Sequence, residues 1–158
     1  MKFNIVESKD HDCVFSRARG TFNAAHLREA HRQSLALELV RAGAPVVNDM
    51  RFVNFSVRTS ETMTVRNLPF AAHARQGKRR IAFVAGSTLG FGMLRIIAAM
   101  REYDHQITDV FREFQHAFDW IQRPALGDAL PDSIDRSLDA PGEKGAGPDD
   151  FDLVIGQA

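Results

Sequence analysis

The chain has 158 residues, of which 44% are hydrophobic and 25% charged, a length and composition that fit one soluble domain and argue against disorder or a membrane protein. Its 20 basic side chains balance 20 acidic ones, so it lacks the positive field of most nucleic-acid-binding proteins, and we expect no nucleic acid partner. Cys13 is the single cysteine and the start MKFNIVESKD has no apolar run of the secretory type, so we expect a cytoplasmic protein.

The first part of the chain predicts a β-hairpin followed by a helix. FNIVES and CVFSRARG have the length and composition of strands, and the polar turn KDHD separates them, which is the pattern of an antiparallel hairpin. Leu35 and Leu39 then recur at helical spacing. Thr21 or Asn23 is suited to cap the start of this helix and Gly43 to end it, which predicts about five turns.

The next part predicts a strand and a second helix. VVNDMRF follows Pro45 and has the apolar content of a strand. A Ser- and Thr-rich stretch then leads into a helical pattern through Met63 and Phe70. Pro69 lies inside this pattern and lacks the amide donor that a helix interior needs, so it should kink or divide the helix.

The run KRRIAFVAG predicts the most buried strand, and GSTLGFGMLRIIAAM predicts the helix after it. A last strand is expected at 107–111, and a final helix after it. One face of the GSTLGFGMLRIIAAM helix is expected to carry a buried stripe formed by Leu89, Met93, Ile96, Ile97 and Met100. The final helix is expected to share one apolar side formed by Phe114, Ala117, Phe118 and Ile121.

Strands separated by helix-length connections predict parallel neighbours and an α/β fold. We therefore expect one domain over 1–123 with a mixed sheet of four to five strands, an opening antiparallel hairpin, about four helices, and central parallel strands at 46–49 and 81–85. Over 124–158 the composition is rich in Pro, Gly and Asp, which predicts a flexible tail. Its last residues, FDLVIGQA, regain apolar side chains and either dock on the domain or stay mobile like most chain ends.

Three segments in this order, RRIAFVAG, GFGMLRIIAAM and DVFREFQHAFDWI, resemble the bacterial SpoIIAA-like family of the STAS and CRAL-TRIO type. The family's final helix carries an Ala-x-x-Trp pattern, which matches Ala117 and Trp120, and its third strand is similar to VVNDMRF with Asp49 near the end. The resemblance covers roughly residues 2–122 and rests on the order and spacing of short motifs.

The resemblance implies a non-catalytic regulatory or protein-interaction module without a cofactor, acting as a homo-oligomer, most simply a dimer, with an unidentified protein partner. The alternative, implied by the CRAL-TRIO relationship and by an excess of Phe and Met, is a binder or carrier of a small apolar or amphipathic ligand. No catalytic constellation is found in the sequence. No integral membrane segment is expected either, because no apolar stretch approaches the roughly 20 residues that span a bilayer.

The glycines Gly86, Gly90 and Gly92 follow a buried strand, the place where phosphate-binding loops occur, but their spacing fits neither G-x-x-x-x-G-K-[ST] nor G-x-G-x-x-G. We interpret them as structural glycines that allow a sharp turn and a close approach of helix and sheet. The alternative is a ligand or partner contact at the helix start, to which the following polar side chains would contribute: Ser87, Thr88 and Arg95.

In the STAS-type anti-sigma-factor antagonists, a Ser in an Asp-Ser-x-Gly stretch after the third strand is phosphorylated. An ungapped alignment puts Val57 and Arg58 at the Asp and Ser positions, so this motif is absent. Ser56 and Ser60 are nearby hydroxyls that either cap the next helix or accept a phosphate, and capping is the simpler role.

Other reactive side chains give weaker indications. Cys13 stands beside Val14 and Phe15 in a strand, where a cysteine is usually a small buried apolar residue. The six histidines are scattered without a metal-binding motif, so no metal is expected. The basic run KRR at 78–80 is either a partner patch or, as we favour, a solvated helix end that leads into a strand.

Overall fold

The computed structural model describes residues 1–55, 79–100, 106–126, 132–139 and 152–157. The first half of the chain contains β1 (Lys2–Ser8), β2 (Cys13–Thr21), α1 (Ala24–Ser34), α2 (Glu38–Arg41) and β3 (Val46–Asn54). The second half contains β4 (Arg79–Val84), α4 (Thr88–Met100), β5 (Gln106–Phe111), α5 (Phe114–Trp120), the 3₁₀ turn η1 (Pro124–Leu126), α6 (Asp132–Asp139) and β6 (Asp152–Gln157).

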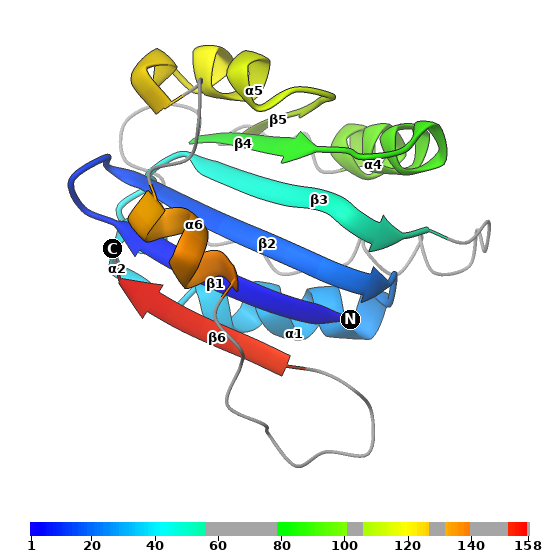
Figure 1. Ribbon diagram of the computed structural model, residues 1–158, viewed down its shortest axis with the longest axis horizontal. Helices are drawn as coiled ribbons and strands as arrows, with labels where there is room; N and C mark the ends of the chain where they lie inside the picture. The colour runs from blue at the N-terminus through cyan, green and yellow to red at the C-terminus, as the bar shows by residue number, and fades with distance from the viewer. Residues whose placement is uncertain (56–78, 101–105, 127–131, 140–151, 158) are drawn as a thin grey trace.

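The strands form one mixed sheet in the order β5-β4-β3-β2-β1-β6 (Figure 1). β1 pairs antiparallel with β2, whereas β2, β3, β4 and β5 are parallel to one another. The α/β class, the opening hairpin and the two central parallel strands are therefore confirmed. The sheet has six strands instead of four to five because β6 adds in parallel to the free edge of β1.

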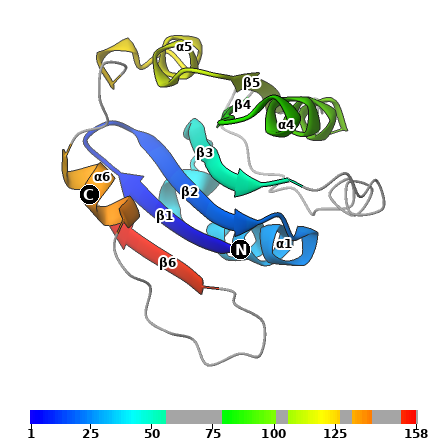
Figure 2. The same cartoon turned by 45° about the vertical axis from the view of Figure 1, so that its right-hand side comes forward.

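Alternation along the strands divides the core into two layers, since successive side chains point to opposite faces of a sheet. One face packs against α1, α2 and α4, and its core includes Phe3, Val14, Met50, Phe83 and Leu94. The other face packs against α5, η1 and α6, and its core includes Phe15, Val47, Val84, Phe118 and Ile134. Figures 1 and 2 show α1 and α6 on opposite sides of β1 and β2.

The helix expected after the hairpin is divided into α1 and α2. The Asn23 side chain caps α1 by accepting hydrogen bonds from the amides of Ala25 and His26, as expected from the sequence. The buried carboxylate of Glu7 accepts from the amide of Leu39 at 2.6 Å, which satisfies a free donor at the start of α2. Gly43 has a φ of +78°, the left-handed conformation that ends helices.

The buried face of α4 differs from the expected stripe. Leu89 and Ile96 are 43% and 46% exposed, whereas Leu94, Ile97 and the flanking Ala98 are buried. The exposed pair and the buried residues both recur at helical spacing. Because α4 is apolar on most of its surface, the sequence alone does not show which of these residues face the sheet. Met93 and Ile97 are buried as expected, and the side chain of Met100 lies outside the described residues. Two large apolar side chains of α4, Leu89 and Ile96, are therefore exposed to solvent.

Three elements of the range 124–158, predicted to be a flexible tail, are part of the domain. Ile134 and Leu138 of α6 are fully buried against β1 and β2, and Leu126 of η1 joins the same core. β6, within the apolar end FDLVIGQA, pairs with all but the last residue of β1. The amino-acid composition did not predict this packing, because two apolar residues at helical spacing are enough to attach a short helix to the core. A strand at the edge of a sheet also has unpaired backbone groups with which a later segment can pair.

Arg17 links α6 to the centre of the sheet. Its side chain is 4% exposed and pairs with Asp49 at 2.8 Å, with Asp135 at 2.7 Å and with Asp139 at 2.7 Å. Asp49, 1% exposed, also accepts from Arg51. Burial lowers the pKa of Arg17, but the three carboxylates raise it, and the net shift is upward. The cation is thus satisfied on every side, as a buried charge requires.

Several expected features lie outside the described residues. They include the second helix through Met63 and Phe70, its kink at Pro69, and the hydroxyls Ser56 and Ser60. The same holds for residues 127–131 and 140–151. Among the described helices, none is both long and apolar enough to cross a membrane.

Arg17→Met should lower the free energy of unfolding by about 3 kcal/mol, because it leaves Asp49 buried with a single partner and removes the two ion pairs that link α6 to the sheet. Urea unfolding measures the change. Arg95→Met is the matched control, since its ion pair with Asp109 is exposed and should be worth less than about 1 kcal/mol. Equal effects of the two variants would contradict a structural role for the buried pair.

Candidate functional site

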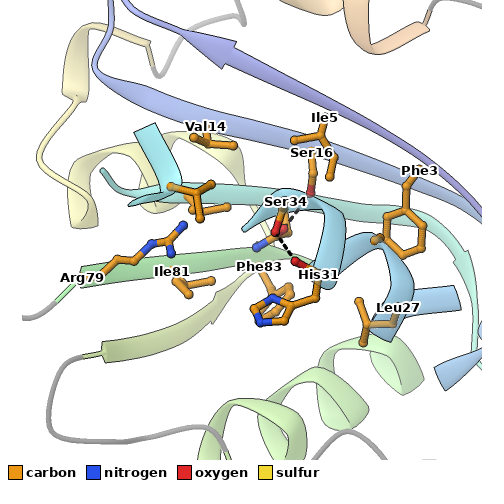
Figure 3. A pocket seen from close by; sticks show the side chains of 14 residues that line it. Phe3, Ile5, Val14, Ser16, Leu27, His31, Ser34, Arg79, Ile81 and Phe83 are labelled. Atoms are coloured by element: carbon orange, nitrogen blue, oxygen red, sulfur yellow. Dashed lines mark hydrogen bonds between the residues drawn. The ribbon is translucent and has the colours of Figure 1, made fainter. Parts of the chain in front are cut away.

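A cavity of about 70 Å³ lies between α1 and the sheet. Side chains from β1, β2, β3, β4, α1 and α2 line it, and Figure 3 shows them converging on the space under α1. Most of its wall is apolar, and the large apolar residues on it include Phe3, Ile5, Leu27, Val40, Ile81 and Phe83. A void of this size in a close-packed core is a binding-site candidate, because interiors otherwise leave few gaps larger than a water molecule.

The floor of the cavity carries two polar side chains on adjacent parallel strands. Ser16 of β2 and Asn48 of β3 are register partners, and the Ser16 hydroxyl donates to the side-chain oxygen Oδ1 of Asn48 at 2.6 Å. The Asn48 amide nitrogen donates weakly to the carbonyl of Ala82, at 3.4 Å. Asn48 remains partly exposed although β3 is a central strand, and the cavity that it lines accounts for this exposure.

Arg79, the first residue of β4, contributes the cation of the cavity. Its Nε donates to the carbonyl of Ala44 at 3.1 Å, and this bond fixes the orientation of the guanidinium group. Among the described residues no carboxylate lies within 4.0 Å of Arg79, and its two terminal nitrogens have no partner there. In Figure 3 the guanidinium points from β4 toward the space under α1.

The environment of Arg79 is unfavourable for its charge. Burial lowers its pKa from 12.5 to about 10, and the thiol of Cys13 shifts it slightly upward. Burial also lowers the pKa of Arg17, yet its carboxylates more than compensate for this effect. The contrast identifies Arg79 as a desolvated cation that the described part of the chain does not neutralise.

The roof of the cavity is the inner face of α1. Ala30, His31 and Ser34 line it, and the Ser34 hydroxyl donates to the backbone carbonyl of His31 at 2.7 Å (Figure 3). His31 and Ser34 are partly exposed, as is Arg79. These three side chains therefore lie where the cavity meets solvent, whereas Phe3 and Phe83 form its buried wall.

The residues singled out from the sequence lie elsewhere, at the carboxyl end of β4. The Ser87 hydroxyl accepts from the Gly90 amide at 3.0 Å and so caps α4, and Thr88 is exposed on the first turn. Arg95 pairs with Asp109 at 3.2 Å on the surface. The structure brings Ser87 and Gly90 together but places Arg95 on a later turn, engaged with an acid of β5.

Two of the three glycines have no room for a side chain. A Cβ at Gly86 would lie 2.4 Å from the carbonyl oxygen of Arg51, and one at Gly90 would lie 3.1 Å from the ring of Phe55. A Cβ at Gly92 would meet nothing within 4 Å. Close packing of the turn against β3 thus accounts for Gly86 and Gly90, and it gives no account of Gly92.

The remaining reactive side chains form no site in the described part of the chain. Cys13 is completely buried, and burial raises the pKa of its thiol to about 12, so the reactive thiolate is scarce at neutral pH. No group of three or more His, Cys, Asp or Glu side chains there has metal-binding geometry. The solvated interpretation of the KRR run is wrong for Arg79 and Arg80, which are partly buried in β4.

Comparison of the chain with protein-family models, with curated proteins and with solved structures finds no match. The resemblance to the SpoIIAA-like family stays a prediction. The argument for function therefore starts from the cavity and its side chains.

Sequence reasoning missed Ser16, Asn48 and Arg79, although each carries a recognisable pattern. Ser16 and Asn48 are polar residues inside otherwise apolar strands, CVFS and VVND, where a polar side chain calls for an explanation. In KRRIAFVAG, strand alternation puts Arg79 on the same side as Ile81 and Phe83. Only the pairing of the strands shows that the three positions meet under one helix.

Gly86→Ala should lower the free energy of unfolding by about 2 kcal/mol, because the new methyl group meets the backbone of Arg51. Gly92→Ala should raise it by up to about 1 kcal/mol, because the position is exposed, helical and open. Thermal or urea unfolding of both variants measures the two shifts. A destabilising effect of Gly92→Ala would show that this glycine has a role that packing does not explain.

Proposed function

We propose that this protein is a non-catalytic binding module that takes a small amphipathic molecule into the cavity under α1. The observation that carries the proposal is the Arg79 guanidinium, held by the Ala44 carbonyl at the edge of a mostly apolar cavity. Ligand sites in proteins combine apolar walls with a few fixed polar groups in the same way. The alternative suggested by the sequence, a binder of a small ligand, is thus the function that the geometry supports best.

The polar groups of this cavity are suited to recognition. The Asn48 amide and the Ser16 hydroxyl are oriented by their mutual bond, and each retains a further donor or acceptor. Arg79 carries a permanent charge at physiological pH, since even its lowered pKa of about 10 lies well above neutrality. These three groups, an amide, a hydroxyl and a guanidinium, do not gain or lose protons near neutral pH. They therefore suit the binding and orientation of a ligand by hydrogen bonds rather than acid–base catalysis.

The volume sets the size of the ligand. One buried water molecule, which has a single non-hydrogen atom, needs a cavity of at least about 15 Å³. A cavity of about 70 Å³ therefore accepts about five non-hydrogen atoms. A short apolar chain with one polar end meets this limit. A long lipid chain would need α1 to move away from the sheet.

Ala30→Leu should abolish ligand binding, because Ala30 is a buried roof residue whose extension fills the cavity. Ala25→Leu is the matched control, since Ala25 is exposed on the same helix. Chemical-shift titration of ¹⁵N-labelled protein with butyrate, butyramide, n-butanol and n-butylamine measures binding. Native mass spectrometry of protein made in bacteria reports any co-purified ligand. The proposal fails if none of the four probes shifts amides of α1, β2 or β3 in the unmodified protein.

A second candidate function, a protein-interaction module that forms a homodimer, has support from α4. Leu89 and Ile96 are exposed, lie seven residues apart on one helix face, and have Gly92 between them with open space above it. Large exposed apolar side chains at such spacing are typical of a helix contact. A second copy of the chain that presents the same face would bury both residues symmetrically.

Ile96→Lys should convert the dimer to a monomer, because a charge at the centre of this face opposes its burial. The thermal midpoint should stay within about 2 °C, since Ile96 is exposed in the single chain. Ser133→Lys, an exposed position on α6, is the control. Size-exclusion chromatography with light scattering gives the mass of each variant. An unmodified protein that is already monomeric at high concentration would contradict this second function.

A further inference from the structure

The cavity has one charged end and one apolar end, and we infer that its ligand is a short-chain monocarboxylate whose carboxylate binds Arg79. This inference rests on the proposed function and adds the chemical class of the ligand. The charged end lies at the amino terminus of β4, where Arg79 lines the opening, and the apolar end lies among Phe3, Leu27 and Phe83. A molecule that satisfies both ends is an acid with a short hydrocarbon chain.

The geometry of the guanidinium group favours a carboxylate. Nε is already engaged with the Ala44 carbonyl, so the donors left for a ligand are those on the two terminal nitrogens. Two parallel N–H groups match the two oxygens of a carboxylate, which is the arrangement of bidentate pairs elsewhere in proteins. Within this chain Arg17 shows how fully a buried guanidinium is satisfied by carboxylates, with one on each of its three nitrogens.

The charges around the cavity favour an anion over a neutral or cationic ligand. None of the described residues that line it is Asp or Glu, and Arg79 carries a positive charge at neutral pH. A desolvated cation without a counter-charge is costly, so an anion brought next to it is stabilised more strongly than in solvent. A neutral ligand of equal shape would gain only hydrogen bonds, and a cationic one would be repelled.

The polar floor supplies a second anchor for the same acid. Asn48 and Ser16 lie on the same face of the sheet as Arg79 and line the same cavity, and the Asn48 amide has a donor beyond its weak bond to Ala82. The apolar wall beyond them takes the hydrocarbon chain. With space for about five non-hydrogen atoms, propionate, with three carbons and two oxygens, fills the cavity, and butyrate, with one atom more, fits with its carboxylate at the opening beside Arg79.

The deciding comparison is between butyrate and butyramide, which have the same shape but differ in charge. We expect butyrate to bind the unmodified protein at least about tenfold more tightly than butyramide or n-butanol, measured by chemical-shift titration or calorimetry. Arg79→Gln should remove this preference, so that acid and amide bind alike. Arg95→Gln should leave it unchanged, because that arginine is exposed and paired with Asp109 on α4's surface.

The outcomes separate the inference from the function on which it rests. Equal binding of butyrate and butyramide by the unmodified protein would overturn the carboxylate assignment while leaving a ligand site in place. Tighter binding of inorganic phosphate than of butyrate would overturn it as well. Failure of every probe would overturn the proposed function itself. The comparison on unmodified protein needs no variant, so the test holds even if Arg79→Gln folds poorly through loss of its bond to Ala44.

Discussion

The parallel register between β2 and β3 fixes both polar clusters of this protein. Ser16 pairs with Asn48 and Arg17 pairs with Asp49, and the alternation of a strand sends the two pairs to opposite faces of the sheet. On one face Ser16 and Asn48 form the floor of the cavity under α1. On the other face Arg17 and Asp49 form the buried ion pair that also holds α6. A slip of one residue between β2 and β3 would break both pairs and turn the side chains of the shifted strand to the opposite faces, so both layers depend on this pairing.

Arg17 and Arg79 show how the same type of side chain serves different purposes. Arg17 is surrounded by carboxylates from β3 and α6, and its charge contributes to the attachment of a late segment of the chain to the sheet. Arg79 has a backbone carbonyl and an apolar cavity around it, and burial acts against its charge. A protein selected for stability alone would gain by replacing such a cation with an apolar residue. Its charge is consistent with a ligand that supplies a counter-charge, which none of the described residues provides.

The turn between β4 and α4 illustrates a structural use of residues that resemble a binding motif. Gly86 lets the chain pass against the backbone of Arg51, Ser87 caps the helix, and Gly90 packs against Phe55. Each of these contacts brings α4 close to the sheet. The same close approach turns Leu94, Ile97 and Ala98 inward and leaves Leu89 and Ile96 in solvent.

The sequence by itself determined the α/β class, the opening hairpin, the central parallel strands and several local caps, including those of Asn23 and Gly43. These features follow from periodicity and from backbone preferences, which act over a few neighbouring residues. The sequence also showed polar residues at Ser16, Asn48 and Arg79 without showing that they meet. Their meeting, the inward face of α4 and the packing of α6 and β6 were decided only by the tertiary structure. They depend on strand order, register and helix rotation, because contacts between residues far apart in the chain set these quantities and no local pattern encodes them.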